Sequence, residues 1–195
     1  MLPFVGLTGG IGAGKSTALD ALGRLGAATL STDRVVHELY GDPGVRDEVV
    51  ARFGGAVQRD GMIDRAALAR AAFATPQDRQ WLESLLWPRV GERMVAWREG
   101  LETVRPRPRA AVIEVPLLFE SGLDPGFDAT IAVIADEASR TDRAAARGHE
   151  ALAERGARQL SQEEKAQRAT YTVRNDATTA DLESKLSAIL DMLGR

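Results

Sequence analysis

The sequence contains no cysteine, so it can form no disulfide, no cysteine-based metal site and no thiolate nucleophile. It also lacks any apolar run near the roughly 18 residues that a membrane-spanning helix needs. The first residues enter an apolar segment directly, without the basic region and cleavage site of a secretion signal. We therefore expect a cytoplasmic protein with no membrane partner.

A large charge of one sign is lacking as well. The chain has 25 Lys and Arg against 28 Asp and Glu, a net charge of −3, which gives no reason to expect a nucleic-acid partner. Its 195 residues, 44% of them hydrophobic, are enough for one globular domain or for a core with a modest insert.

The strongest pattern that is present is a glycine-rich segment at residues 9–17, GGIGAGKST. It fits G-x-x-x-x-G-K-[ST], in which glycines let successive backbone N–H groups approach phosphate oxygens closely. The lysine places an ammonium group against the β- and γ-phosphates, and Ser16 offers its hydroxyl to Mg²⁺. The expected ATP contacts are Gly10, Ile11, Gly12, Ala13, Gly14, Lys15, Ser16 and Thr17.

Both flanks of this segment fit a phosphate loop. Leu2–Leu7 is a short apolar run typical of a buried strand, and Ser16–Leu25 carries leucines at helical spacing. Strand, glycine loop and helix is the context that the motif requires. A chance glycine-rich turn is the alternative, and the two flanks argue against it.

The rest of the chain predicts a parallel sheet. Four further apolar segments read as strands, and a polar or amphipathic helical segment follows most of them: Gly26–Asp33, Ala110–Val115, Ala129–Ala135 and Tyr171–Asn175. Thr179–Leu193 is a well-patterned amphipathic helix. Alternation of strands and helices predicts an α/β fold of the P-loop NTPase type, with helices on both faces of the sheet.

Two segments interrupt this core. Residues 34–100 predict a mostly helical, substrate-binding insert, in which we expect the tryptophans to pack into the core. Residues 140–168 are polar, helical and rich in arginine, which indicates either a solvated pair of helices or a mobile lid that closes over phosphates. The nucleotide-binding core is then residues 1–33, 101–139 and 169–195.

Asp33 stands where the second predicted strand ends. In open α/β sheets, ligands gather beyond the carboxyl ends of the strands, so we expect Asp33 near the γ-phosphate. A helix N-cap is the other interpretation of an aspartate at this position.

The class of P-loop protein follows from what accompanies the loop. The guanine signature N-K-x-D and a D-x-x-G element are missing from plausible places, which argues against a GTPase. The third strand carries Glu114, a partial match only to the acidic strand end of motor-type ATPases. A short chain with an insert and an arginine-rich segment favours a small-molecule kinase.

A closer resemblance is carried by motifs along nearly the whole chain. The opening GLTGGIGAGKST and the element VPLLFE at residues 115–120 together resemble the dephospho-CoA kinase family. Further segments agree in order, among them RFG, DGMIDR, LLWP, the pairs Arg143 with Arg147 and Arg155 with Gln159, and the late Asn175. Ser31, Trp87, Arg140 and Thr170 depart from the family pattern.

The resemblance implies ATP-dependent phosphorylation of the ribose 3′-hydroxyl of dephospho-CoA, with Mg²⁺, to give CoA and ADP. Lys15, Asp33, Arg143 and Arg147 are then the catalytic residues, and Asn175 joins the ATP site. The residues expected to bind dephospho-CoA are Asp33, Arg65, Pro116 and Leu117, whereas Glu120 braces the structure. A nucleoside monophosphate kinase and a non-catalytic ATP-binding module are the alternatives.

Overall fold

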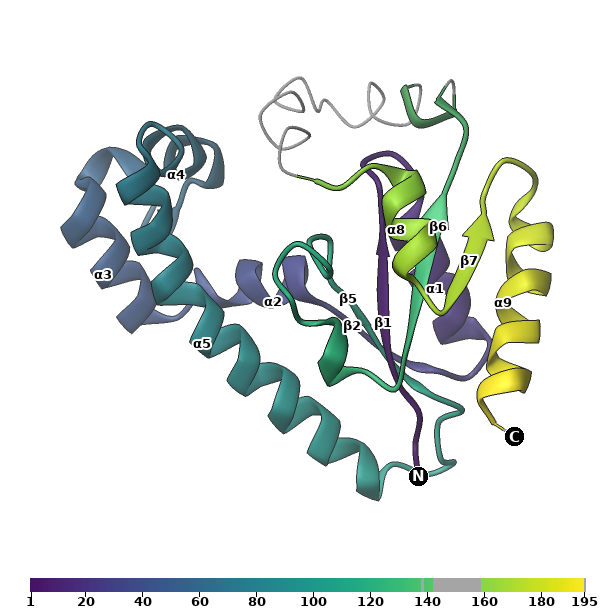
Figure 1. The fold of residues 1–195 in the computed structure, drawn as a ribbon. Coiled ribbons are helices and arrows are strands. Elements are labelled where there is room, and N and C mark those ends of the chain that lie inside the picture. Colours follow the sequence, from purple (N-terminus) through teal and green to yellow (C-terminus); the bar gives the residue numbers. More distant parts are fainter. Residues whose placement is uncertain (138, 142–158, 195) are drawn as a thin grey trace. The chain divides into compact units, whose positions relative to one another are not determined.

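The structure is a computed structural model that describes residues 1–137, 139–141 and 159–194. The chain divides into two compact units, one formed by Met1–Ser31 with Leu101–Arg195 and the other by Thr32–Gly100. The first unit contains the sheet and the phosphate loop, and the second is mostly helical (Figure 1).

The first unit is built on a five-stranded parallel sheet with the order β2-β5-β1-β6-β7. The central strand β1 spans Phe4–Gly9, between β5 (Ala111–Glu114) and β6 (Ala129–Ile134). The edge strands are β2 (Ala28–Ser31) and β7 (Tyr171–Arg174). All five carboxyl ends therefore meet at one edge of the sheet, where the phosphate loop follows β1.

Helices cover both faces of this sheet, which confirms the predicted fold class (Figure 1). On one face, α1 (Lys15–Arg24) packs against α9 (Thr179–Leu193), and their leucines form one apolar core with Val5 and Leu7 of β1. Successive strand residues face opposite sides. Gly6 and Thr8 accordingly face the other side, where α8 (Gln162–Arg168) lies.

The second unit contains four helices: α2 (Thr32–Leu39), α3 (Pro43–Phe53), α4 (Arg65–Ala72) and α5 (Pro76–Gly100). A short 3-10 helix, η1 (Gly55–Val57), leads into the hairpin of β3 (Gln58–Arg59) and β4 (Met62–Ile63). Asp60 and Gly61 form its turn with φ values of 51° and 77°. Two-residue hairpin turns of this kind require positive φ at both positions, which Asp-Gly supplies.

Some element boundaries differ from those expected. Strand β1 begins at Phe4 and continues to Gly9, because Thr8 and Gly9 pair with Ala132 and Val133 of β6. The insert begins at Thr32, since α2 follows β2 without an intervening turn. The connection after the insert starts with a 3-10 helix, η2 (Leu101–Thr103), and another, η3 (Asp124–Gly126), precedes β6.

The expectation for the tryptophans is only partly right. All three lie in α5. Trp81 meets the ring of Phe53 edge-on at 5.5 Å, and the guanidinium carbon of Arg52 lies 5.9 Å from the Trp81 ring centroid. Trp87, however, is 41% exposed and is not a core residue.

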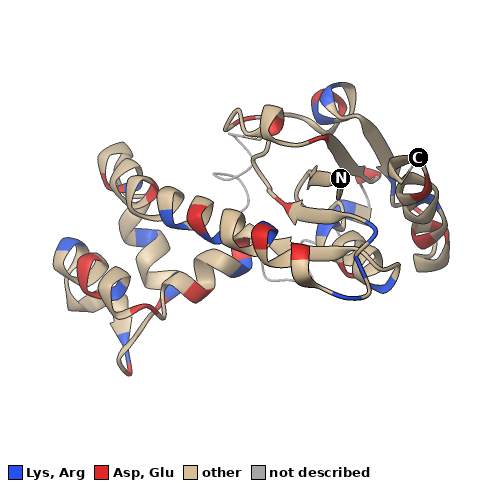
Figure 2. Ribbon diagram, turned by 90° about the horizontal axis from the view of Figure 1, so that it is seen from below, with Lys and Arg blue, Asp and Glu red and all other residues tan. Residues whose placement is uncertain are grey.

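Acidic and basic residues are mixed over both units. In Figure 2, acidic and basic residues are interspersed along the helices of each unit. Within the described residues, no helix is long and apolar enough to cross a bilayer.

Thr170, one of the departures from the family pattern, exchanges two hydrogen bonds with Thr130. The backbone N–H of Thr130 donates to Thr170 Oγ1, and the N–H of Thr170 donates to Thr130 Oγ1, both at 3.0 Å. This reciprocal pair ties the start of β6 to the chain entering β7. Thr130 itself is buried, so its N–H depends on this acceptor.

We expect Thr170→Val to lower the free energy of unfolding by about 1–2 kcal/mol, because a buried N–H loses its acceptor. Thr170→Asp should lose less, since a carboxylate oxygen can still accept from Thr130. Urea unfolding measures the difference. Thr172→Val is the matched control, because its hydroxyl donates to Ala166 at an exposed position. Equal stability of Thr170→Val and the wild-type protein would contradict the role given to the pair.

Candidate active site

The phosphate loop leaves the N-terminus of α1 without an internal cap. Gly14 occupies the N-cap position with φ 92°, no described side chain caps the helix, and its first turn contains no acidic residue. The first N–H groups of a helix have no partner within the helix, and they carry a partial positive charge. This end of α1 is therefore an anion site of the kind that phosphates occupy.

Two positions in the loop admit glycine only. A Cβ on Gly12, where φ is +75°, would lie 2.4 Å from the backbone oxygen of Arg140. A Cβ on Gly9, where φ is +156°, would lie 2.3 Å from the backbone oxygen of Val133. Contacts this short to backbone atoms cannot be relieved by a side-chain rotation, so the glycines are needed for packing as well as for the turn.

Lys15 lies with its ammonium group against the loop. Its Nζ donates to the carbonyl oxygens of Gly9 and Gly10, both at 3.1 Å. The next residue, Ser16, is exposed, so its hydroxyl is accessible to a ligand. Within the described residues, no group of three or more His, Asp or Glu side chains could hold a metal ion.

Asn175, expected in the ATP site, contacts the loop. It is buried, and its Nδ2 donates to the carbonyl oxygen of Ala13 at 2.9 Å. Its own N–H donates to Ile134 at 2.8 Å, which fixes the residue at the carboxyl end of the sheet. An effect of Asn175 on ATP binding would therefore act through the loop, and this remains a prediction.

Two further residues that hold the loop were missed by the sequence analysis. The Nε of Arg140 donates to the carbonyl oxygen of Ile11 at 2.9 Å. The side-chain amide of Gln162 exchanges two hydrogen bonds of 2.9 Å with the backbone of Ala135, and its Cγ lies 3.0 Å from the position of a Cβ on Gly10. Neither contact has a local sequence signal, because each joins segments far apart in the chain.

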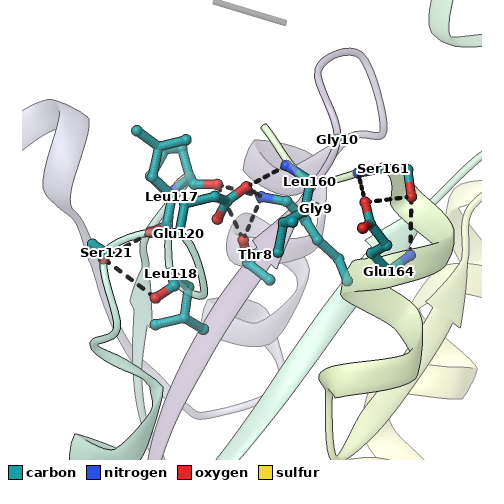
Figure 3. A network of polar contacts seen from close by, with 12 residues as sticks. Thr8, Gly9, Gly10, Leu117, Leu118, Glu120, Ser121, Leu160, Ser161 and Glu164 are labelled. Atoms are coloured by element: carbon teal, nitrogen blue, oxygen red, sulfur yellow. Dashed lines mark hydrogen bonds and ion pairs between the residues drawn. The ribbon is translucent and has the colours of Figure 1, made fainter. Parts of the chain in front are cut away.

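The segment after β5, expected to line the acceptor site, is held by polar contacts. The carbonyl oxygen of Pro116 accepts from Thr8 Oγ1 at 3.2 Å and from Lys165 Nζ at 2.6 Å. Glu120 Oε1 accepts from the N–H of Leu160 at 2.8 Å and pairs with Lys165 Nζ at 3.0 Å (Figure 3). The structure thus confirms the bracing role expected of Glu120.

Lys165 lies in α8, which belongs to the described part of residues 140–168; residues 142–158 of that segment lie outside the described residues. The Lys165 side chain is fully buried, so α8 is not a helix solvated on all sides. Burial lowers the pKa of Lys165, and its hydrogen bond and charge interaction with Glu120 oppose that change. The sequence does contain the signal for the start of this helix, because Ser161 and Glu164 form a capping box.

Two of the remaining predicted residues, Asp33 and Arg65, belong to the unit Thr32–Gly100. Asp33 is exposed in the first turn of α2, which begins at Thr32, so Asp33 is not the N-cap of that helix. Its carboxylate has no hydrogen bond or ion pair to any residue that the structure describes. Arg65 is exposed at the start of α4. Arg143 and Arg147 lie outside the described residues.

Asp64, next to Arg65, is the N-cap that fixes the start of α4. Its carboxylate accepts from the N–H groups of Ala66 and Ala67, at 2.9 and 3.0 Å. These bonds, that of Ala67 first, lower the pKa of Asp64. The position of Arg65 is thereby set by the cap before it.

The contact between Asn175 and the loop yields a test by ATP binding. Asn175→Asp replaces the donor with a carboxylate that faces the oxygen of Ala13. We expect the Kd for Mg-ATP to rise about tenfold, which corresponds to about 1.4 kcal/mol. Calorimetric titration measures it, with Gln167→Glu, an exposed amide on α8, as the control for added charge. An unchanged Kd in a folded Asn175→Asp variant would show that the loop does not need this bond.

Comparison with known proteins identifies the family. The family model described as dephospho-CoA kinase matches residues 3–181. A dephospho-CoA kinase from Deinococcus radiodurans is 41% identical over 97% of this chain and 91% of its own length. One from Moorella thermoacetica is 40% identical over 95% of this chain and 88% of its own.

A solved structure agrees with these sequences. The crystal structure of TT1252 from Thermus thermophilus superposes with a TM-score of 0.80 and 33% identity, and the match covers 99% of each chain. Because the family match and both relatives span nearly all of the sequence, this chain belongs to the dephospho-CoA kinase family.

Proposed function

We propose that this protein transfers the γ-phosphoryl group of ATP to the ribose 3′-hydroxyl of dephospho-CoA, which gives CoA and ADP in the last step of coenzyme A synthesis. The family match over residues 3–181 is the observation that carries this proposal. The uncapped N-terminus of α1 beside Lys15 supplies the physical support, because it is built to hold a polyphosphate.

On the donor side, the N–H groups of the loop and of the first turn of α1 bind the phosphates. Lys15 would then exchange its carbonyl partners for phosphate oxygens and help to neutralise the charge that develops during transfer. Mg²⁺ fits beside Ser16, because this ion keeps several waters and takes the rest of its ligands from one or two protein groups and the phosphates. Bound there, the ion would neutralise charge on the phosphates.

On the acceptor side, the reacting group is a secondary hydroxyl, which is a poor nucleophile near neutral pH. A positioned carboxylate that accepts its proton removes this difficulty. Asp33 suits the role, because its exposed carboxylate is not engaged by any described residue and follows the carboxyl end of β2 by two positions. A base already paired to an arginine would be less available.

The other roles follow the same division. We assign dephospho-CoA binding to Arg65 in the helical insert and to Pro116 and Leu117 after β5. Arg143 and Arg147, four positions apart, would close over the transferring group as parts of a lid. The expected lid, residues 140–168, would then be limited to the part before α8, because α8 is fixed on the sheet. The reaction belongs in the cytoplasm, where CoA is made.

The test of this proposal is ADP release from ATP and Mg²⁺ with a panel of acceptors. We expect release with dephospho-CoA and little with AMP, CMP or shikimate. Preference for AMP or CMP would favour a nucleoside monophosphate kinase. Nucleotide binding without release for any acceptor would favour a non-catalytic module.

Two substitutions separate the roles of the site. Asp33→Asn keeps the shape of the side chain but removes the base, so kcat should fall about 10²–10⁴-fold with the Kd for ATP nearly unchanged. Lys15→Ala should lower kcat about 10²–10³-fold and weaken ATP binding as well. Asp47→Asn, at an exposed position of α3, is the control. Normal turnover by Asp33→Asn would remove the assignment of Asp33 as base.

A further inference from the structure

Lys165 is the one Lys or Arg that is buried among the residues the structure describes. Removing an ammonium group from water costs several kcal/mol, and the cost is offset only by good polar partners. Helix α8 could satisfy its packing with an apolar residue at this position. A buried charge at this position therefore indicates a role beyond packing. Specificity of the fold is one such role, and positioning of the site is another.

The partners of Lys165 come from two sides of the site. Its Nζ lies 3.3 Å from Thr8 Oγ1, 2.6 Å from the carbonyl oxygen of Pro116 and 3.0 Å from Glu120 Oε1. Thr8 immediately precedes Gly9, where the phosphate loop begins, and Pro116 begins the segment after β5. A single ammonium group thus joins the root of the phosphate loop to the segment assigned to the acceptor.

The geometry of the Lys165 ammonium group suits a link between the phosphate loop and the segment after β5. An ammonium group has three donors, and here it meets three oxygens, one in β1 and two in the segment after β5. Thr8 Oγ1 also donates to Pro116, so the two segments are linked directly and through Lys165. Glu120 extends the link, because its Oε1 also holds the N–H of Leu160, just before α8 (Figure 3).

We propose that Lys165 is a positioning residue, which sets the distance between the phosphate loop and the acceptor wall at Pro116 and Leu117. This assignment rests on the proposed function. The reacting atoms of donor and acceptor must approach within about 3–3.5 Å, and a displacement of about 1 Å can cost 10²-fold in rate. The Lys165 side chain is fully buried, so its effect on the acceptor would pass through the backbone of Pro116.

The test must separate positioning from stability. Lys165→Met preserves length and apolar volume but leaves the largely buried Glu120 without its cation, and Glu120 Oε2 already has no hydrogen-bond partner within the described chain. The double variant Lys165→Met with Glu120→Gln removes both charges, so it should recover most of the melting temperature that the single variant loses. It does not restore the bonds to Thr8 and Pro116.

Steady-state kinetics on both substrates provide the readout. For the double variant we expect kcat/KM for dephospho-CoA to fall about tenfold or more, with the Kd for ATP within about twofold of wild type. Lys185→Met is the matched control, because Lys185 also binds a backbone carbonyl and a carboxylate, at Arg174 and Asp181, but is exposed on α9. This control should keep wild-type kinetics.

The outcomes distinguish the two proposals. Recovery of wild-type kcat/KM together with melting temperature in the double variant would show that Lys165 is structural, and the positioning role would be lost. An equal loss of ATP binding and of kcat/KM would place its effect on the phosphate loop alone and would also overturn the assignment. Absence of ADP release by wild-type protein with dephospho-CoA would instead overturn the proposed function.

Discussion

The phosphate loop must offer N–H groups to a ligand and yet hold one conformation without that ligand. Its carbonyl oxygens solve this problem. Those of Gly9 and Gly10 accept from Lys15, that of Ile11 from Arg140 and that of Ala13 from Asn175. Side chains therefore hold the loop through its carbonyl oxygens, and no described side chain caps the N-terminus of α1. The positions of Arg140, Asn175 and α8 in the fold can all be understood from this requirement.

The sheet supplies the frame that brings these donors to one place. Parallel pairing puts the carboxyl ends of β1, β5, β6 and β7 at one edge, and each strand delivers a residue there: Thr8, Pro116, Ala135 and Asn175. The two faces of β1 then divide the work. Val5 and Leu7 join the apolar core with α1 and α9, whereas Thr8 on the other face meets the ammonium group of Lys165. Stability and site geometry are thereby carried by alternate residues of a single strand.

The sequence was informative where chemistry is local. The phosphate loop, the strands of the core and the helix at Thr179–Leu193 follow from spacing and composition within short windows. The support of the loop was not predictable in this way. Lys165 reads as one more charge in a polar helix, and its contact to Thr8 joins residues 157 positions apart. Arg140 reads only as a departure from the family pattern, although its guanidinium and its backbone oxygen both contact the loop. Such pairings depend on the register of the sheet and on the path of the chain after β6, which no short window encodes.

The placement of all three tryptophans in α5 has a spectroscopic consequence. Indole emission comes only from the unit Thr32–Gly100, and none arises from the unit that contains the sheet. Trp87 is 41% exposed, so its emission is open to quenching by solutes, while Trp81 is shielded by Phe53 and Arg52. Tyr171 of β7 also emits, so the excitation must select tryptophan. Tryptophan fluorescence then observes the helical insert alone, and far-ultraviolet circular dichroism observes both units. Non-coincident unfolding curves from the two signals would mean that the insert and the nucleotide-binding core melt as separate cooperative units.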